Sequence, residues 1–241
     1  MFGKNKITKK EKEYLGAINI TEIFPTIQGE GIHSGRPCVF IRFQGCSLRC
    51  KFCDTSFDDG IPMSVEDILD EISYFLPPKA DPLVVITGGE PFLQAGIVPL
   101  TIGLIDKGID VQIETAGTHW QEGFNAAITS SAFHRQFTII CSPKTGRLNS
   151  TLEKWITAYK YVLIAGQVSE KDGLPNVSPE TGKKLIIARP SDTTENRKVY
   201  VMPCDAHDEE QNARNLQVTV ESSLHHGHTL CLQIHKIIGV E

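Results

Sequence analysis

Apolar and polar residues follow one another along this chain in short blocks. Between residues 18 and 24 they alternate, as they do in a half-buried strand. The block 83–86 is continuously apolar, which is typical of a strand covered on both faces, and further strands are expected at 38–43, 111–115, 138–141, 161–164 and 199–202. A last strand is expected at 229–234. The pattern therefore predicts a sheet whose central strands are buried.

Segments with helical periodicity separate several of these strands. Ser64-x-x-Asp67 resembles a capping box and begins a helix with an apolar face of Val65, Ile68, Leu69, Ile72 and Phe75. A second helical stretch closes at Gly108. A third, between 205 and 227, is expected to bury one side that carries Ala213, Leu216, Val220 and Leu224. Alternating strands and helices predict an α/β fold with parallel strands and right-handed crossovers. Six such strands, counted from Val39, are too few to close an eight-stranded barrel.

Composition narrows the class of protein. The 241 residues are 40% hydrophobic and 22% charged, as in ordinary soluble proteins, and the absence of internal repeats or a long linker predicts a single domain, 1–241. A net charge of -5 without a basic run argues against a nucleic-acid partner. No apolar stretch approaches the ~20 residues that span a bilayer, and the polar first residues predict no signal peptide. Seven cysteines, three of them bunched, do not suggest disulfides, so we expect a cytoplasmic protein.

The bunched cysteines, Cys46, Cys50 and Cys53, are spaced Cys-x3-Cys-x2-Cys. One loop can turn three such sulfurs toward one point, and thiolates are soft ligands for zinc or an iron–sulfur cluster. Structural zinc needs four ligands, and no second Cys or His pair follows to complete such a site. Cys38 is a weak candidate for a fourth ligand, since it belongs to a strand. Three cysteines on a four-iron cluster leave one iron open for a small molecule, which is our hypothesis.

Other distinctive motifs also follow predicted strands. They are Thr87 to Pro91, Glu114 to Gly117 and Ser142 to Lys144. Ligands of parallel α/β folds bind at the carboxyl ends of the strands, so these motifs and the cysteine loop are expected to converge on one site. Each has a purely structural alternative. Gly88 and Gly89 could simply form a tight turn. Phe52 could be a core residue, and Glu114 and Lys144 could each belong to a surface ion pair.

The chain resembles a known family in the stretches Phe24 to Gly31, Phe40 to Arg42 and Cys46 to Thr55. Together with the Cys-x3-Cys-x2-Cys spacing, these are similar to the 7-carboxy-7-deazaguanine synthase family of radical S-adenosylmethionine enzymes. The resemblance runs from about residue 18 to the end. It leaves 1–17 outside as an extension, either a short helix or a loose arm, and is patchy between 165 and 198.

The resemblance implies an open partial (β/α)6 barrel of parallel strands that holds a 4Fe-4S cluster, S-adenosylmethionine and Mg2+. The implied reaction converts 6-carboxy-5,6,7,8-tetrahydropterin to 7-carboxy-7-deazaguanine with loss of ammonia, on the path to queuosine and related deazapurines. An external electron donor such as flavodoxin would reduce the cluster, and the cleaved cofactor would supply a radical that takes hydrogen from C6 of the pterin. Relatives of this kind are often homodimers.

The resemblance also implies residue roles. Cys46, Cys50 and Cys53 would bind the cluster, and Thr55, otherwise part of an Asp-Thr turn, would bind Mg2+. The cofactor would contact Phe52, Cys53, Asp54, Gly88, Gly89, Glu90, Glu114, Ser142, Pro143 and Lys144. The pterin would contact Ile27, Gln28, Gly29, Glu30, Arg42, Thr87, His235 and Glu241. A guanidinium binds a carboxylate through two hydrogen bonds, which makes Arg42 the expected clamp for the pterin carboxylate. The structural alternative for Arg42 is an ion pair with Glu30 or Asp54. For His235 and Glu241, the structural alternative is that they belong to a frayed terminus.

Two other functions remain open at this point. A glycyl-radical-enzyme activase has the same cysteine spacing, but its protein substrate has no carboxylate for Arg42 to bind. A non-catalytic protein that holds zinc or an iron–sulfur cluster is the second alternative, and its metal content after anaerobic reconstitution would distinguish it.

Overall fold

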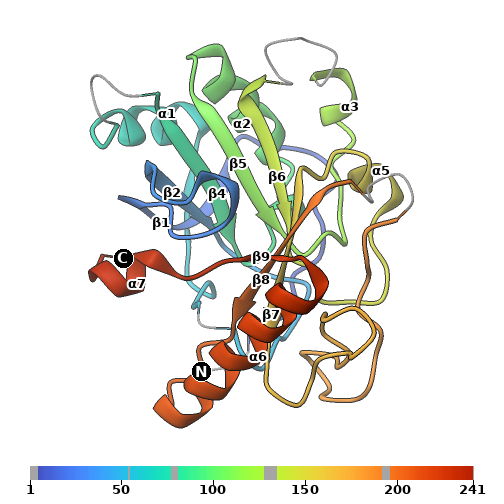
Figure 1. The fold of residues 1–241 in the computed structure, drawn as a ribbon. Helices are drawn as coiled ribbons and strands as arrows, with labels where there is room; N and C mark the ends of the chain where they lie inside the picture. Colours follow the sequence, from blue (N-terminus) through green and yellow to red (C-terminus); the bar gives the residue numbers. More distant parts are fainter. Residues whose placement is uncertain (1–4, 54, 77–80, 128–134, 192–195, 241) are drawn as a thin grey trace.

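The computed structural model describes residues 5–53, 55–76, 81–127, 135–191 and 196–240. The predicted roles of Asp54 and Glu241 therefore lie outside the described residues. The described strands form one nine-stranded sheet in the order β3-β1-β2-β4-β5-β6-β7-β8-β9. Figure 1 shows the parallel strands β4 to β8 fanning out side by side, with helices outside them.

One edge of the sheet is antiparallel. Strand β1 (Ile18–Ile27) pairs with β2 (Pro37–Phe43) on one side and with β3 (Ile61–Met63) on the other. β1 is three residues longer than its alternating pattern indicates, and it extends to the beginning of the Gln28-Gly29-Glu30-Gly31 segment. Ile27 pairs with Pro37 at the start of β2, so the Gln28-Gly29-Glu30-Gly31 segment follows β1 beside the amino-terminal end of β2.

The rest of the sheet is parallel, as predicted. From β2 it continues through β4 (Leu83–Gly88), β5 (Asp110–Thr115), β6 (Phe137–Cys141), β7 (Ala158–Leu163), β8 (Lys198–Pro203) and β9 (Thr229–Leu230). The six strands counted from Val39 are β2 and β4–β8, and the short β9 adds a seventh. Within the described residues the two edge strands, β3 and β9, do not pair with each other, so the architecture is an open, partial barrel. The strand expected at 229–234 is only two residues long, because helix α7 begins at Ile234.

Two helices lie where the sequence indicated, but Phe75, expected on the apolar face of the first, lies beyond its last residue and is 37% exposed. Helix α1 (Val65–Ser73) begins with a complete capping box between Ser64 and Asp67, and it buries Ile68 and Ile72. Helix α2 (Ile97–Asp106) ends at a left-handed Gly108, as the sequence indicated. The remaining short helices are η1 (Gly31–His33), η2 (Pro91–Leu93), α3 (Phe124–Ala127), α5 (Ser150–Glu153) and α7 (Ile234–Ile238).

One large apolar cluster fills the space between the sheet and these helices. Its largest buried side chains are Trp120, Tyr159, Tyr161, Phe43, Phe92 and Phe124. Each large apolar side chain that is fully buried contributes roughly 1.5–3 kcal/mol. This core fixes the positions of the parallel strands and therefore of the residues at their carboxyl ends.

Helix α6 (Glu209–His226) has the predicted bounds but not the predicted buried face. Leu216 and Leu224 are 42% and 78% exposed, whereas Asn215, Thr219 and Ser222 are buried. The Asn215 amide donates to the carbonyl oxygen of Cys204 at 2.8 Å, and the Ser222 hydroxyl donates to that of Gly173 at 2.7 Å. The helix is therefore anchored by hydrogen bonds to loop backbone, and the expectation of an apolar inner face was wrong.

The segment between β7 and β8 folds without regular helices or strands over its described part. Isolated bridges pair Val168 with Pro175 and Val177 with Lys184, and Arg189 forms an ion pair with Asp172 at 2.8 Å. Among the described residues, no helix has both the length and the apolar composition needed to span a lipid bilayer.

Candidate active site

A cavity of about 280 Å³ opens at the carboxyl ends of the parallel strands. This is near the lower end of the range for small-molecule sites. The convergence predicted from the sequence is observed, since predicted site residues from distant parts of the chain line it. They are Gln28, Glu30, Arg42, Cys46, Cys50, Phe52, Cys53, Thr55, Thr87, Gly88, Gly89, Glu114, Ser142, Lys144 and His235. Of the other described candidates, Ile27, Gly29, Glu90 and Pro143 lie outside the lining.

The three clustered cysteines face this cavity from one loop, amid apolar neighbours that include Leu48 and Phe57. Burial raises the pKa of the Cys46 thiol to about 12 and that of Cys50 to about 11. A bound metal centre would displace these protons. Within the described residues, no three metal-ligating side chains stand close enough to share one ion. A four-iron cluster instead takes one sulfur at each of three separate irons, so this donor set fits it.

Gly88 and Gly89 bring strand β4 against the start of the cysteine loop. The Gly89 amide donates to the Phe43 carbonyl at 3.0 Å, and the Glu90 amide donates to that of Gly45 at 2.9 Å. A Cβ at Gly88 would overlap with the backbone of Phe43, and one at Gly89 would overlap with that of Gly45. Close contact between two backbones therefore requires both glycines, in addition to their place in the cavity wall.

Glu90 is fully buried, and its carboxylate stabilises the turn after β4. It accepts hydrogen bonds from the Thr115 hydroxyl at 2.7 Å, the Ala116 amide at 2.9 Å and the Phe92 amide at 3.2 Å. Burial raises the pKa of Glu90, although these donors oppose that shift. The carboxylate thus connects β4 to the end of β5, and its predicted contact with a cofactor stays a prediction.

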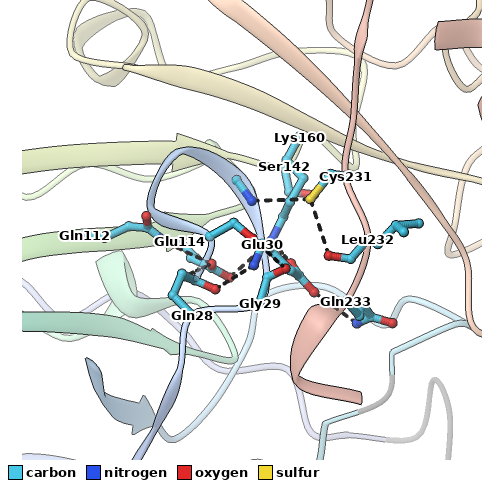
Figure 2. Close-up of polar contacts among 12 residues, drawn as sticks. Gln28, Gly29, Glu30, Gln112, Glu114, Ser142, Lys160, Cys231, Leu232 and Gln233 are labelled. Atoms are coloured by element: carbon cyan, nitrogen blue, oxygen red, sulfur yellow. Dashed lines mark hydrogen bonds and ion pairs between the residues drawn. The ribbon is translucent and has the colours of Figure 1, made fainter. Parts of the chain in front are cut away.

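A buried lysine connects three sides of the cavity (Figure 2). Lys160 on β7 forms ion pairs with Glu30 and, at 3.3 Å, with Glu114 on β5. Gln233 donates to the other oxygen of Glu30 at 2.9 Å. Burial alone would raise the pKa of Glu30, but Lys160 and the Gln233 amide together hold that pKa below its usual value. Burial likewise disfavours the Lys160 ammonium, but the carboxylates of Glu114 and Glu30 together raise its pKa. Glu30 and Lys160 therefore both stay charged.

Amide side chains complete this network. Gln112 donates to Glu114 at 3.0 Å, and Gln28 donates to the same oxygen at 3.3 Å. The Gln28 side-chain oxygen in turn accepts from the Glu30 amide at 2.9 Å, which closes the turn of the Gln-Gly-Glu segment. Gln28 and Glu30 are thus fixed against β5 and β7 by the protein's own contacts.

The C-terminal segment lies directly on Gly29. The Ile234 amide donates to the Gly29 carbonyl at 3.2 Å, and a Cβ at Gly29 would overlap with the His235 ring. His235, partly buried, lines the cavity. Ile234 and His235 are therefore packed onto the site rather than frayed, whereas residues 236–240 are exposed.

Arg42 lies on the opposite wall, at the end of β2. Its Nε pairs with Glu22 on the neighbouring strand β1, and its Nη1 lies 3.3 Å from the hydroxyl of Thr55. The guanidinium also lies over the Phe24 ring, 5.5 Å from its centroid. These contacts orient the cation at the cavity, and its pairing with Glu22 was not foreseen.

Lys144 and Phe52 form a further part of the wall. The ammonium of Lys144 donates to the Ser142 carbonyl at 3.0 Å and lies 5.7 Å from the Phe52 ring centroid. The motif after β6 is thereby joined to the cysteine loop. An isolated surface ion pair, the structural alternative for Lys144, does not describe this arrangement.

The polar residues that sequence reasoning missed include Glu22, Gln112, Lys160 and Gln233. A usable signal existed for two of them. Gln112 and Lys160 are polar interruptions of apolar strands, where a fully buried polar side chain needs partners. Glu22 belongs to a strand with alternating polar residues and Gln233 lies near the C-terminus, and only the tertiary structure brings them to the site.

Comparisons with known proteins agree with this geometry. A model of the "Radical SAM superfamily" matches residues 40–128. The 7-carboxy-7-deazaguanine synthase of Rhodospirillum rubrum is 38% identical over 247 aligned residues, which cover 100% of both chains. That of Rickettsia prowazekii is 34% identical and covers 93% of this chain and 89% of its own. The crystal structure of QueE from Escherichia coli has a TM-score of 0.62 at 24% identity, covering 90% of this chain and 94% of its own, and this likeness shows the fold.

Proposed function

The chain belongs to the 7-carboxy-7-deazaguanine synthase family of radical S-adenosylmethionine enzymes, and from that premise we propose how its residues divide the work. It is an enzyme of queuosine biosynthesis that uses a 4Fe-4S cluster and S-adenosylmethionine. The activase and the non-catalytic metal protein are not favoured. The observation that carries this conclusion is the 38% identity to the Rhodospirillum rubrum enzyme along the whole chain. The position of the three clustered cysteines in the cavity lining agrees with it.

We assign the cluster to Cys46, Cys50 and Cys53, which come from one loop and face one cavity. When bound, the cluster supplies the electron that cleaves S-adenosylmethionine and starts hydrogen abstraction from C6 of the carboxypterin. The protein's own residues position both small molecules and exclude water from them. The wall built by Phe52, Gly88, Gly89, Glu114 and the Ser142–Lys144 motif is adjacent to the cysteines and suits the cofactor.

The pterin is proposed to bind between Arg42 and the Lys160 network. Arg42 would bind its carboxylate, and Gln28 and Glu30 would face its ring edge, with Thr87 and His235 nearby. Each oxygen of the Glu30 carboxylate has a second lone pair, so contacts with Lys160 and Gln233 leave capacity to accept from pterin N–H groups. Glu30 held in its charged form is the appropriate partner for such donors.

Mg2+ is proposed at Thr55. A divalent cation there would lie beside the Arg42 guanidinium, since the Arg42 Nη1 is 3.3 Å from the Thr55 hydroxyl. Two cations so close require a shared anion, and the substrate carboxylate can serve both. Mg2+ commonly takes few protein ligands and keeps several waters, which suits a single hydroxyl.

Anaerobic reconstitution followed by an assay tests this function. The reconstituted protein should contain iron, and with S-adenosylmethionine, Mg2+ and a reductant it should convert 6-carboxy-5,6,7,8-tetrahydropterin to 7-carboxy-7-deazaguanine. One zinc and no iron, or full iron content with no turnover of the pterin, would overturn it.

The remaining proposals concern organisation. Residues 1–241 are proposed to work as one radical SAM domain, in the cytoplasm, without nucleic acid or membrane, and reduced by an external donor. We propose a homodimer as well, because Leu216 and Leu224 leave apolar surface on α6 that a second copy could cover. Sedimentation of the protein should give twice the chain mass, and a monomer at micromolar concentration would contradict it.

A further inference from the structure

Three segments distant in sequence meet on the outer side of the cysteine loop. The first is the arm 5–12, for which the sequence allows a short helix or a loose extension. In the structure it is extended and bound: the Thr8 amide donates to the Cys46 carbonyl at 2.9 Å, and the Asn5 side chain donates to that of Leu48 at 2.9 Å. Arg49 donates back to the Asn5 carbonyl at 2.8 Å.

The second segment is residues 49–51 of the cysteine loop, and the third is 177–184, from the irregular connection between β7 and β8. The Lys51 amide donates to the Pro179 carbonyl at 2.9 Å, and the Arg49 amide donates to the Glu180 carboxylate at 2.8 Å. In Figure 1 this connection lies at the same end of the sheet as the cysteine loop. The arm and the connection therefore frame residues 49–51 from two sides.

The surface formed by these three segments, here called the basic rim, is positive on a protein of net charge -5. Its exposed cations are Lys6, Lys9, Lys10, Lys12, Arg49, Lys51, Lys183 and Lys184. The carboxylates in the same segments are Glu11 and Glu180. Glu11 accepts from the Ala95 amide at 3.0 Å, and Glu180 accepts from that of Arg49. The eight cations outnumber these two carboxylates, so the net charge of the basic rim is positive.

The cysteine loop places these positive charges next to the proposed iron–sulfur cluster. Cys46, Cys50 and Cys53 line the cavity, whereas Arg49 and Lys51, between them in sequence, are exposed. A protein that contacts the basic rim comes within the thickness of one loop of the proposed cluster. We propose that the basic rim is the docking surface for a negatively charged electron-carrier protein that reduces the cluster.

This inference rests on the proposed radical function and goes beyond it, since it locates the approach of the donor. The carrier gives up one electron and the cluster gains it, so no bond forms between the proteins. Electrostatic complementarity would raise the association rate and permit a small, short-lived interface, as in other redox encounters. It also predicts sensitivity to salt.

The same charge would attract nucleic acid, but the rim is less suited to it. None of the residues 5–12, 49–51 and 177–184 is aromatic, so these segments offer no stacking platform for bases. The rim also surrounds the cysteine loop, which is where a redox partner must approach. We therefore favour the electron carrier and treat RNA as an outcome of the test.

The experiment uses reconstituted holoenzyme and an acidic flavodoxin as the probe. Charge is reversed on one side of the rim in Lys183→Glu/Lys184→Glu and on the other side in Lys6→Glu/Lys9→Glu. The matched control is Lys107→Glu/Lys198→Glu, which reverses two exposed lysines at the opposite end of the strands. Three quantities are measured: the Kd for oxidised flavodoxin, the rate of cluster reduction by reduced flavodoxin, and turnover driven by dithionite.

Both rim variants should weaken flavodoxin binding and slow reduction by about tenfold at low salt, with the difference shrinking near ~0.5 M salt. The control variant should resemble the unmodified protein, and dithionite-driven turnover should be equal in all. The proposal would be overturned if both rim variants bound flavodoxin with unchanged affinity. It would also be overturned if the rim variants lost binding to bulk tRNA but kept their binding to flavodoxin. Absence of dithionite-driven turnover in the unmodified holoenzyme would instead overturn the proposed function.

Discussion

The ammonium of Lys160 and the carboxylate of Glu30 form a buried ion pair that joins strand β7 to the segment after β1. These groups are 130 residues apart in sequence, and Glu114 shares the same lysine. The pair is therefore a tertiary crosslink across the open barrel, placed at the wall where the pterin is proposed to bind.

Replacing Lys160 with methionine should destabilise the protein strongly. Buried Glu30 and partly buried Glu114 would remain without their cation, and loss of one partner of a buried ion pair costs about 3–5 kcal/mol. For a chain of this size we expect the unfolding temperature to fall by roughly 10 °C. Thermal unfolding followed by circular dichroism measures it.

The control for Lys160→Met is Lys198→Met, which removes an exposed lysine at the start of β8 and should change stability by less than about 0.5 kcal/mol. The double variant Lys160→Met/Glu30→Gln should be more stable than Lys160→Met alone, because one of the two unpaired charges is gone. A double variant less stable than the single one would contradict this account of the pair.

Gly29→Ala should displace the C-terminal segment and weaken substrate binding. The new Cβ would overlap with the His235 ring, which cannot move without releasing the packing of α7 on the Gln-Gly-Glu segment. We expect the KM for the carboxypterin to rise by about tenfold, or ~1.4 kcal/mol, with iron content unchanged. Steady-state kinetics and an iron assay measure the two.

Gly103→Ala is the matched control for this substitution. Gly103 lies within α2, where the nearest atom to a new Cβ would be the flexible Leu69 methyl at 3.1 Å, and alanine favours a helix. Its KM should not change. A Gly29→Ala enzyme with ordinary KM and a protease-resistant C-terminus would show that the contact with His235 has no role in binding.

Cys50→Ala should prevent assembly of the cluster, because a three-cysteine site has no spare ligand. Iron content and the brown absorbance after reconstitution should fall nearly to background, whereas Cys38→Ala should retain both. Cys38 is buried among Leu83, Val85 and Phe40 and does not itself line the cavity. Loss of iron in Cys38→Ala without loss of folding would reinstate it as a fourth ligand and leave no open iron.

Much of this site is predictable from the chain, for physical reasons that particular residues illustrate. Parallel strands place their carboxyl ends at one edge, so the order of strands and motifs is enough to group Cys46, Thr87, Glu114 and Ser142. Helix α6 shows the opposite case. The leucines there have helical spacing, but the inner face is decided by whether Asn215 can reach the Cys204 carbonyl, which depends on tertiary contacts.

The same distinction applies to charge. Composition gives a net charge of -5, and no run of basic residues appears in the sequence. The basic rim exists only because the arm 5–12 and the 177–184 segment fold against residues 49–51. Likewise, Lys160 could be identified as an unusual charge in an apolar strand, but not as the partner of Glu30. Pairwise contacts across long sequence separations are what single-sequence reasoning lacks.

Arg42→Lys should show how much of the proposed binding of the substrate carboxylate depends on positive charge and how much on the geometry of the guanidinium. Lysine keeps the positive charge but cannot make two parallel hydrogen bonds, nor hold Glu22 and Thr55 at once as the guanidinium does. We expect the KM for the carboxypterin to rise by about tenfold, and Arg42→Ala to raise it further, while both variants keep full iron content.

Glu22→Gln is the informative companion to these variants. If Glu22 only orients Arg42, the amide should still accept a hydrogen bond, and the KM should rise less than in Arg42→Lys. A Glu22→Gln enzyme with tighter substrate binding would mean that Glu22 competes with the pterin carboxylate for the guanidinium, and that the ion pair must open for substrate to enter. Equal KM values for unmodified enzyme, Arg42→Lys and Arg42→Ala would remove Arg42 from the binding site, and the carboxylate would then require another cation in the cavity.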